Sequence, residues 1–378
     1  MDLSFTLKSI EAHLFRVPIE EPVVTSFGVM RDRPALFVRA ISSQGDVGWG
    51  EIWCNFPSVG AEHRARLVNS VLAPACVGRD YGDPAEAWRQ LSGATEVLAI
   101  QSGEPGPLAQ SIAGIDIALW DMVARRCGLP AYRMFREENV DCVPVYASGI
   151  NASAPEVLAA VKRQEGYRRF KLKVGFGKER DVANLRAMRE TLGADTAIMV
   201  DANQAWSLDE ALEMARALAP FSPLWLEEPM RADQPMIAWR EMAEGSPIPI
   251  ALGENLRGTE QFTDAIAGSG ASFLQPDIGK WGGFSGCVAI GRQALEHGLV
   301  FCPHWLGGGV GLVASLHLLA AVGGPGVLEV DANPNSLRDV FVRNFPSVTA
   351  SGDMNVPAGA GLGVEPDLDA MAQFRIEI

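Results

Sequence analysis

The stretch RRFKLKVGFG, residues 168–177, combines the apolar alternation of a β-strand with two lysines, Lys171 and Lys173. In a strand, side chains two residues apart point to the same face. Both ammonium groups are therefore predicted to lie on one face, while Phe170 and Leu172 occupy the other. Two positive charges on one side of a buried strand need negative partners or a special chemistry, so the neighbouring segments decide what this strand does.

Short apolar runs of this kind recur from about residue 143 onward, and segments with helical spacing, such as residues 179–193 and 208–220, separate them. This alternation predicts the α/β class, and eight units predict a (β/α)8 TIM-type barrel. A doubly wound nucleotide-binding sheet is disfavoured because no GxGxxG motif follows a first strand. The eight runs are VPVYAS (143–148), RFKLKV (169–174), AIMVD (197–201), PLWLEE (223–228), IPIALGE (248–254), SFLQPD (272–277), LVFCPH (299–304) and GVLEVD (326–331).

Residues 1 to about 125 follow a different order, with strands first and helices after. Alternation of apolar and polar residues indicates the strands, and apolar residues at helical spacing indicate the helices. This part of the chain is therefore predicted to form a separate α+β domain. The predicted strands lie within residues 9–19, 35–44 and 45–53, and the predicted helices within 61–76 and 109–128.

The chain has 378 residues, of which 48% are hydrophobic, and a formal net charge of −14. This negative charge disfavours nucleic acid or an anionic membrane as a partner. No apolar run approaches the ~18 residues of a membrane span, and the start MDLSFTLKSIEAHLF lacks the pattern of a signal peptide. The six scattered cysteines contain no CxxC pair and predict buried free thiols. We therefore expect a cytoplasmic protein.

Seven of the eight runs carry an ionisable side chain at or near the carboxyl end, spaced by about one strand–helix unit. In a barrel these strand ends converge on one mouth, where active sites lie. A single acid at a strand end is often only a helix cap, but capping does not explain seven such residues in register. The seven are Lys173, Asp201, Glu227, Glu254, Asp277, His304 and Glu329.

Asp201, Glu227 and Glu254 are predicted to bring three carboxylates together from adjacent strands. Three negative charges in a dry site need a compensating cation. Oxygen ligands that leave coordination positions open suit Mg²⁺, and a salt-bridge network with arginine or lysine is the alternative. Alternation places Leu226 and Glu228 on one face and Glu227 on the other, so we expect only Glu227 of this pair to point inward.

A divalent cation beside Lys173 would lower the pKa of that lysine toward the range of a general base. Across the mouth, Asp277 is expected to hold one imidazole nitrogen of His304 and to raise the basicity of the other. Lys173 and His304 would then face a substrate from opposite sides. The alternatives are solvated lysines on an edge strand and a structural role for His304. A structural role is preferred for the other histidines, His13, His63, His297 and His317.

The motifs KLK, VDAN, WLEEP, GEN, PDIGKWGG, PHWLGGG and LEVD together resemble the enolase superfamily, specifically its mandelate racemase subgroup. The resemblance extends over nearly the whole chain, and residues 113–130 are similar to the helix that precedes the barrel in that family. It implies an α+β capping domain at residues 1–125 and a modified, (β/α)7β-like barrel at residues 126–350. Residues 351–378 are implied to return to the capping domain.

The resemblance implies that Asp201, Glu227 and Glu254 are Mg²⁺ ligands. It also implies that two loops of the capping domain, residues 21–33 and 48–60, determine specificity. Their composition is mixed, and the apolar residues in them would equally serve to seal the capping domain against the barrel. The predicted substrate contacts are Asn203, Thr25, Ser26, Trp53, Asn55 and Trp305.

The remaining strand-end residues are implied to be catalytic. Lys173 matches a base on one face of the substrate, and Lys171 matches its neighbour near the substrate carboxylate. His304 and Asp277 match a dyad on the other face. Glu329 matches the group that hydrogen-bonds a carboxylate oxygen as negative charge develops there.

The implied reaction is Mg²⁺-dependent removal of the proton α to a carboxylate, which gives an enediolate. The site must stabilise a developing dianion, because such a proton is very weakly acidic. We favour dehydration of an acid sugar, with racemisation or epimerisation of an α-substituted acid as the alternative. A non-catalytic, Mg²⁺-stabilised binding barrel is a further alternative. The expected partners are a small carboxylate substrate and further copies of the chain in a homo-oligomer.

Overall fold

The computed structural model describes residues 2–24, 28–150 and 153–378. Its larger part is a sheet of parallel strands in the order β11-β10-β9-β8-β7-β6-β5-β12. Consecutive strands are neighbours, and the eighth strand pairs with the first, as in a barrel. The strands are β5 (Cys142–Ile150), β6 (Arg169–Lys173), β7 (Ala197–Asp201), β8 (Leu226–Glu227), β9 (Ile250–Leu252), β10 (Phe273–Leu274), β11 (Val300–Phe301) and β12 (Leu328–Asp331).

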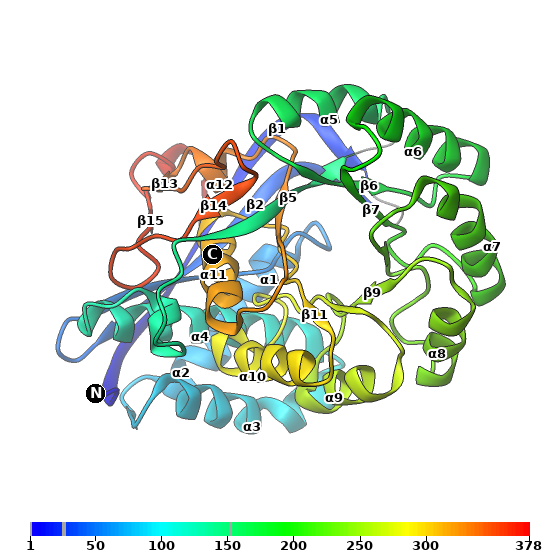
Figure 1. Ribbon diagram of the computed structural model, residues 1–378. Helices are drawn as coiled ribbons and strands as arrows, with labels where there is room; N and C mark the ends of the chain where they lie inside the picture. Colours follow the sequence, from blue (N-terminus) through cyan, green and yellow to red (C-terminus); the bar gives the residue numbers. More distant parts are fainter. Residues whose placement is uncertain (1, 25–27, 151–152) are drawn as a thin grey trace.

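A helix follows each of the first seven barrel strands, and together these helices surround the strands (Figure 1). Only the short helix α12 (Ser336–Asp339) follows the eighth strand. The predicted α/β barrel of the (β/α)7β type is therefore confirmed. The seven helices are α5 (Pro155–Gln164), α6 (Lys178–Leu192), α7 (Leu208–Leu218), α8 (Met236–Gly245), α9 (Gly258–Gly268), α10 (Gly283–Glu296) and α11 (Gly309–Val322).

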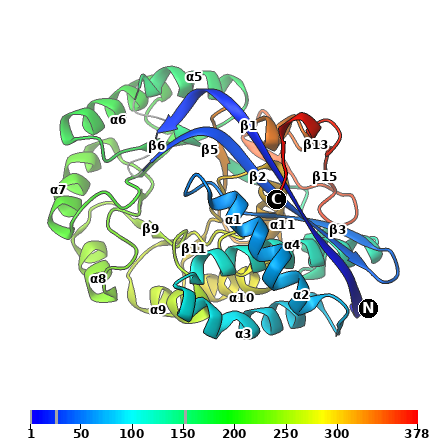
Figure 2. The same cartoon turned by 180° about the vertical axis from the view of Figure 1, so that it is seen from behind.

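The N-terminal part is an antiparallel sheet with helices, which we call the cap. Figure 2 shows its long strands β1 and β2 extending across the barrel. The C-terminal strand β16 (Arg375–Ile376) pairs with β1, whereas β14 (Asp353–Asn355) pairs with β5 of the barrel. The domain boundaries themselves remain a prediction. The cap elements are β1 (Phe5–Val24), β2 (Val29–Ser42), β3 (Val47–Ile52), β4 (Asp80–Tyr81), α1 (Gly60–Leu67), η1 (Val68–Leu72), α2 (Ala73–Cys76), α3 (Pro84–Ser102) and α4 (Pro105–Arg126).

Short connecting elements complete the fold. Near the C-terminus β13 pairs with β15 in an antiparallel ladder. Three 3₁₀ turns of the described chain lie at the start of the barrel, after α7 and near the end of the chain. The pair lies beside the cap strands in both views (Figures 1 and 2). These elements are η2 (Ala131–Met134), η3 (Ala219–Phe221), β13 (Val342–Arg343), β15 (Glu365–Pro366) and η4 (Ala372–Phe374).

Close packing against helix α4 fixes the position of the cap strand β3. Gly48 and Gly50 of β3 lie so near α4 that a Cβ atom at Gly50 would stand 2.1 Å from the carbonyl oxygen of Gly114. At the end of β3, the buried carboxylate of Glu51 accepts hydrogen bonds from the backbone of Gly308 at 2.5 Å and Gly311 at 2.9 Å. The cap is thereby attached to the amino end of barrel helix α11, which favours a negative charge.

A buried ion pair also joins the cap to the barrel. Nη2 of Arg33, on β2, lies 2.6 Å from Oδ2 of Asp331, on β12, and the two side chains are only 2% and 3% exposed. We expect Arg33→Met to lower the free energy of unfolding by about 3 kcal/mol, because it leaves the buried carboxylate of Asp331 without its partner. Urea unfolding measures this change. Arg231→Met, which breaks an exposed pair with Asp233, is the matched control and should cause no measurable change; equal effects would contradict the assignment.

His317, on α11, is completely buried. Burial lowers its pKa to about 4, although the hydrogen bond with the carbonyl of Leu362 opposes this shift. Because the unfolded chain binds a proton that the folded chain excludes, stability should fall as the pH drops from about 6.5 toward 4, by about 3 kcal/mol for this one group. Urea unfolding at several pH values measures the loss. The loss of stability between about pH 6.5 and 4 should be smaller in His317→Gln. The same pH dependence of stability in that variant as in wild type would contradict the prediction.

Other predictions from composition can be compared with the structure. Among the described residues, no helix combines the length and the apolar character needed to cross a membrane. All the cysteines are free, as predicted, but Cys142 is exposed and Cys127 is half-buried, so the expectation of burial is wrong for these two. Both lie at the ends of elements: Cys142 begins β5, and Cys127 follows α4, where it packs against the edge of the cap core.

Candidate active site

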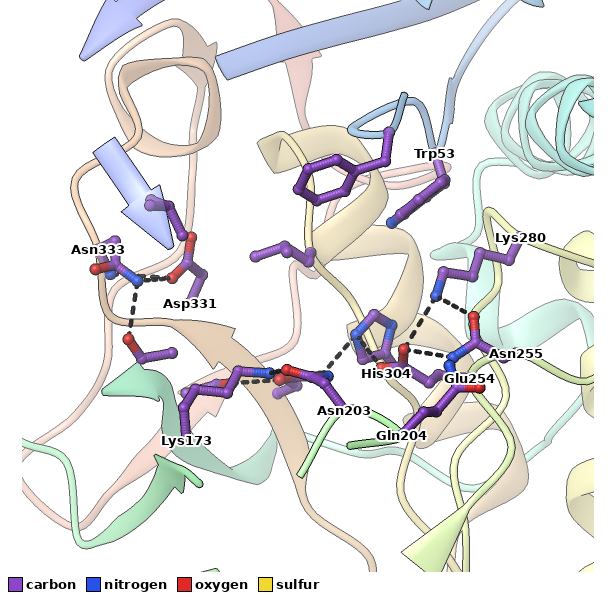
Figure 3. A pocket seen from close by; sticks show the side chains of 16 residues that line it. Trp53, Lys173, Asn203, Gln204, Glu254, Asn255, Lys280, His304, Asp331 and Asn333 are labelled. Carbon is purple, nitrogen blue, oxygen red and sulfur yellow. Dashed lines mark hydrogen bonds and ion pairs between the residues drawn. The ribbon is translucent and has the colours of Figure 1, made fainter. Parts of the chain in front are cut away.

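A cavity of about 180 Å³ lies at the mouth of the barrel, beneath the cap. Its apolar lining is Val23, Trp53, Phe56 and Leu306, of which the first three come from the cap. The barrel contributes the polar side chains, many of which are linked by hydrogen bonds (Figure 3). They are Ser148, Lys173, Asn203, Gln204, Glu254, Asn255, Lys280, His304, Glu329, Asp331 and Asn333.

The two lysines of β6 both point to the inside of the barrel, as the alternation predicted. Lys171 is completely buried, and its Nζ lies 2.5 Å from Glu227, 2.8 Å from Glu329 and 3.4 Å from Asp201. Lys173 lies closer to the cavity, where its Nζ donates to Asp201 at 2.5 Å and to the side-chain oxygen of Asn203 at 2.8 Å. The two ammonium groups thus have several carboxylate partners.

These partners decide the direction of the lysine pKa shifts. Burial alone would lower the pKa of Lys173, but the negative charge of Asp201 outweighs burial and raises it. The pKa of Lys171 is raised well above its usual value, because Glu227 and Glu329 outweigh the effect of burial. These shifts arise from the protein groups alone, so the lowering of the Lys173 pKa by a neighbouring divalent cation stays a prediction.

His304 and Asp277 form the predicted dyad. Nδ1 of His304 lies 2.6 Å from a carboxylate oxygen of Asp277, and Nε2 lies 2.8 Å from Glu254. The two residues also form a parallel bridge just beyond the ends of β10 and β11, which keeps them adjacent. Burial alone would lower the pKa of His304, but Glu254, Glu329 and the hydrogen bond with Asp277 raise it to about 10.

Glu329 lies at the base of the cavity, on β12. One of its oxygens accepts from Ser148 on the neighbouring strand β5, and it also faces Lys171. The other oxygen lies 3.6 Å from Nε2 of His304. Glu329 is therefore placed between the lysine and histidine groups that were predicted to be catalytic.

The carboxylates of Asp201, Glu227 and Glu254 come from three consecutive units of the barrel and are all buried. Each has a basic partner, which is Lys173 for Asp201, Lys171 for Glu227, and both His304 and Lys280 for Glu254. No group of three or more His, Cys, Asp or Glu residues in the described ranges is compact enough to hold a metal ion as it stands. The type of donor nevertheless fits a hard divalent cation, because all three are oxygen ligands.

The expectation that only one acid of the Glu227–Glu228 pair points inward is wrong. Glu228 is also buried, and its carboxylate accepts from Nδ2 of Asn255 at 2.7 and 3.0 Å. Alternation fails because β8 ends at Glu227 and Glu228 has a left-handed backbone with φ of 38°. Burial and the charge of Glu254 raise the pKa of Glu228 well above its usual value, whereas Lys280 opposes this shift.

The predicted substrate contacts separate into three groups. Asn203 and Trp53 line the cavity. Asn55 and Trp305 do not line it: Asn55 donates to the carbonyl of Leu306 at 2.6 Å, and the ring of Trp305 packs against the glycine-rich start of α11. Direct substrate contact by these two therefore does not fit the geometry. The other two predictions, Thr25 and Ser26, lie outside the described residues.

Sequence reasoning missed several residues of the cavity. Lys280 follows β10, and its Nζ lies 3.2 Å from both Glu254 and the side-chain oxygen of Asn255. Its signal was available, because Lys280 lies in the motif PDIGKWGG directly after a strand end. Three of the other missed residues, Gln204, Asn255 and Asn333, lie in loops after strand ends, which strand alternation does not describe. The remaining two, Ser148 and Asp331, lie within β5 and at the end of β12.

Comparison with protein families agrees with this architecture. Residues 9–135 match the family described as mandelate racemase/muconate lactonizing enzyme, N-terminal domain, and residues 155–370 match the family described as enolase C-terminal domain-like. The chain belongs to the mandelate racemase/muconate lactonizing enzyme family of the enolase superfamily. This confirms the resemblance seen in the sequence motifs.

Family members resemble the chain over almost its full length. D-galactarolactone cycloisomerase from Agrobacterium fabrum is 30% identical, with 98% of this chain and 99% of the relative covered. A mandelate racemase/muconate lactonizing enzyme structure from Bordetella bronchiseptica RB50 is 50% identical, with a TM-score of 0.91 and coverage of 98% and 99%. A racemase from Streptomyces coelicolor A3(2), solved with bound magnesium, is 26% identical, with a TM-score of 0.89 and coverage of 98% and 100%. Other curated relatives include arabinonate and D-galactonate dehydratases and N-succinylamino acid racemases.

Proposed function

We propose that the protein catalyses Mg²⁺-dependent removal of the α-proton from a hydroxy carboxylate, followed by loss of a β-hydroxyl group. The observation that carries this proposal is that Lys173 and His304 line the same cavity, each oriented by a carboxylate. They belong to the second and seventh units of the barrel. A substrate between them would have a base on one side and a proton donor on the other.

Asp201, Glu227 and Glu254 would hold the Mg²⁺ ion. Their donor chemistry fits it, and the related racemase from Streptomyces coelicolor was solved with magnesium. When bound, the ion supplies positive charge that stabilises the negative charge developing on the substrate carboxylate.

Lys173 is proposed to take the α-proton, which requires its neutral amine. Lys171 and Glu329 lie deeper in the barrel, where the ammonium of Lys171 would attract a carboxylate oxygen of the substrate. Glu329 would form a hydrogen bond with the other carboxylate oxygen of the substrate when a proton lies on that oxygen or between the two groups. These groups are held in place before substrate arrives, which is the condition for effective electrostatic stabilisation.

His304 is proposed to protonate the departing hydroxyl group. Its contact with Asp277 fixes the ring and stabilises the imidazolium form, so a proton is available on the other nitrogen, which faces the cavity. The lining favours a polyhydroxylated substrate, because Ser148, Asn203 and Gln204 can all donate or accept hydrogen bonds to hydroxyl groups.

Racemisation is the second candidate reaction. Two groups able to carry a proton line one cavity, and the similar Streptomyces coelicolor protein is described as a racemase. In that reaction each group would serve one enantiomer, and no hydroxyl group would leave.

A screen of carboxylic acids in both configurations, with Mg²⁺ present, tests the proposal. Dehydration should produce a 2-keto acid, which semicarbazide detects by absorbance, whereas racemisation should abolish optical rotation without keto acid. We expect keto acid from at least one acid sugar. Tight binding of acids without turnover or α-proton exchange would instead support a non-catalytic binding barrel and contradict the proposed function.

A further inference from the structure

Trp53 of the cap and Lys280 of the barrel lie together at one side of the cavity. Nζ of Lys280 lies 4.7 Å from the centroid of the Trp53 ring, a cation–π contact. Lys280 is only 7% exposed, although it follows a strand at the open mouth of the barrel. Figure 3 shows this pair on the side of the cavity away from Lys173. The pair is therefore separate from the proposed base.

Both groups can donate hydrogen bonds and neither can accept one. Nε1 of Trp53 is buried and has no hydrogen-bond partner among the residues described here, and Figure 3 shows this nitrogen turned toward the cavity. A buried donor without a partner costs free energy, so a ligand that accepts from it gains the corresponding amount. Lys280 makes two long contacts, both at 3.2 Å, with Glu254 and Asn255.

A further cation lies beside the pair. The guanidinium of Arg64 lies 5.7 Å from the centroid of the same indole ring and is buried. Burial alone would lower the pKa of Lys280, but the charges of Glu254, Asp277 and Glu228 raise it, so Lys280 carries a proton to donate. Glu254 also contacts His304 at 2.8 Å, so its charge is shared between two basic groups. A group that only accepts hydrogen bonds and carries negative charge is the natural partner for the Trp53 and Lys280 donors.

We propose that Trp53 and Lys280 bind a second carboxylate at the far end of the substrate, so that the preferred substrates are dicarboxylic sugar acids. This inference rests on the proposed function for the identity of the reacting end. The amide and hydroxyl groups elsewhere in the lining accept as well as donate, which suits hydroxyl groups. The donor-only pair distinguishes a terminal carboxylate from a terminal CH₂OH group.

Two matched pairs of acids test this inference, galactaric with galactonic acid and glucaric with gluconic acid. Within each pair the acids share their configuration and differ only at carbon 6. Binding is measured by calorimetry with Mg²⁺ present, in protein carrying Lys173→Met so that no turnover occurs. For the pair that binds more tightly, the dicarboxylic acid should bind at least about tenfold more tightly, because a charge-assisted hydrogen bond is lost in its partner.

Variants then locate the preference. Lys280→Met should weaken binding of the dicarboxylic acid about 10- to 100-fold and leave the monocarboxylic acid within about threefold. Trp53→Phe keeps the aromatic face and removes only the donor, so it should weaken the dicarboxylic acid by about fivefold. Lys178→Met, which removes an exposed lysine paired with Glu213, is the control and should change neither.

Equal binding within both pairs, equal losses for both acids in Lys280→Met, or failure of all four acids to bind would overturn the inference. The inference and the proposed function can fail independently of each other. Preferential binding of a dicarboxylic acid that the enzyme with Lys173 intact never turns over would support the inference and count against the proposed function. Turnover confined to monocarboxylic acids would support the proposed function and count against the inference.

Discussion

Lys173→Ala should lower kcat by about 10³-fold, because general base catalysis contributes roughly 10²- to 10⁴-fold and alanine offers no base. His304→Asn should cause a loss of similar size in the formation of keto acid. The measurement is steady-state turnover of the acid found in the screen. KM should change much less than kcat, since both substitutions remove interactions that matter mainly in the transition state.

Two further variants complete this experiment. Asp277→Asn should reduce turnover less than His304→Asn, because the imidazole remains but its orientation and its protonated form lose support. His297→Asn removes an exposed histidine on the barrel surface and is the matched control. Wild-type kcat in Lys173→Ala or in His304→Asn would show that the two-sided site described above does not carry the reaction.

Removal of the metal should have an equally large effect. Chelation should abolish turnover, and Mg²⁺ should restore it. Calorimetric titration of Mg²⁺ into metal-free protein should show that Glu227→Gln and Glu254→Gln each weaken binding by about 100-fold, since each replaces an anionic ligand by a neutral one. This binding measurement does not depend on activity.

Glu228→Gln is the matched control for the metal experiment. Glu228 is as buried as Glu227, but its oxygens are engaged by the side chain of Asn255, so this substitution should weaken Mg²⁺ binding less than about tenfold. A strong loss of Mg²⁺ affinity in Glu228→Gln, with normal Mg²⁺ binding in Glu227→Gln, would show that Glu228 and not Glu227 is the metal ligand. Full activity after complete chelation would contradict the metal requirement itself.

Much of this architecture could be predicted because a parallel barrel repeats a simple pattern. Each short apolar run became a strand, and four of the seven ionisable residues at or near the strand ends line the cavity, namely Lys173, Glu254, His304 and Glu329. The pairing of His304 with Asp277 followed from the same logic, since consecutive strands are neighbours in the barrel. The sequence motifs then assigned the chain to its family.

Most failures occur where a strand has ended. Glu228 follows the last residue of β8 with a left-handed backbone, so strand alternation could not predict its direction. Lys280 lies three residues beyond Asp277, in a loop whose path depends on packing with the cap. The prediction of substrate contact for Asn55 and Trp305 failed for a related reason. A residue in a motif beside the site can hold a loop in place instead of contacting a ligand.

The direction of the lysine pKa shifts could not be predicted from the sequence either. It depends on which charges lie within a few ångströms of each amine, and the strand pattern does not reveal whether a carboxylate or a cation is nearest. Asp201 lies 2.5 Å from Lys173, and its negative charge outweighs burial and raises the pKa of this lysine.

The central claim is that this site removes an α-proton, and the exchange of that proton tests it most directly. The measurement is the ¹H NMR signal of the α-position in D₂O, recorded for carboxylic acids with wild-type protein and Mg²⁺, and then with the single variants. We predict deuterium incorporation with wild type, its loss in Lys173→Ala, and its retention in His304→Asn together with little keto acid. No exchange of any acid by the wild type, or wild-type exchange and turnover in both variants, would contradict the account.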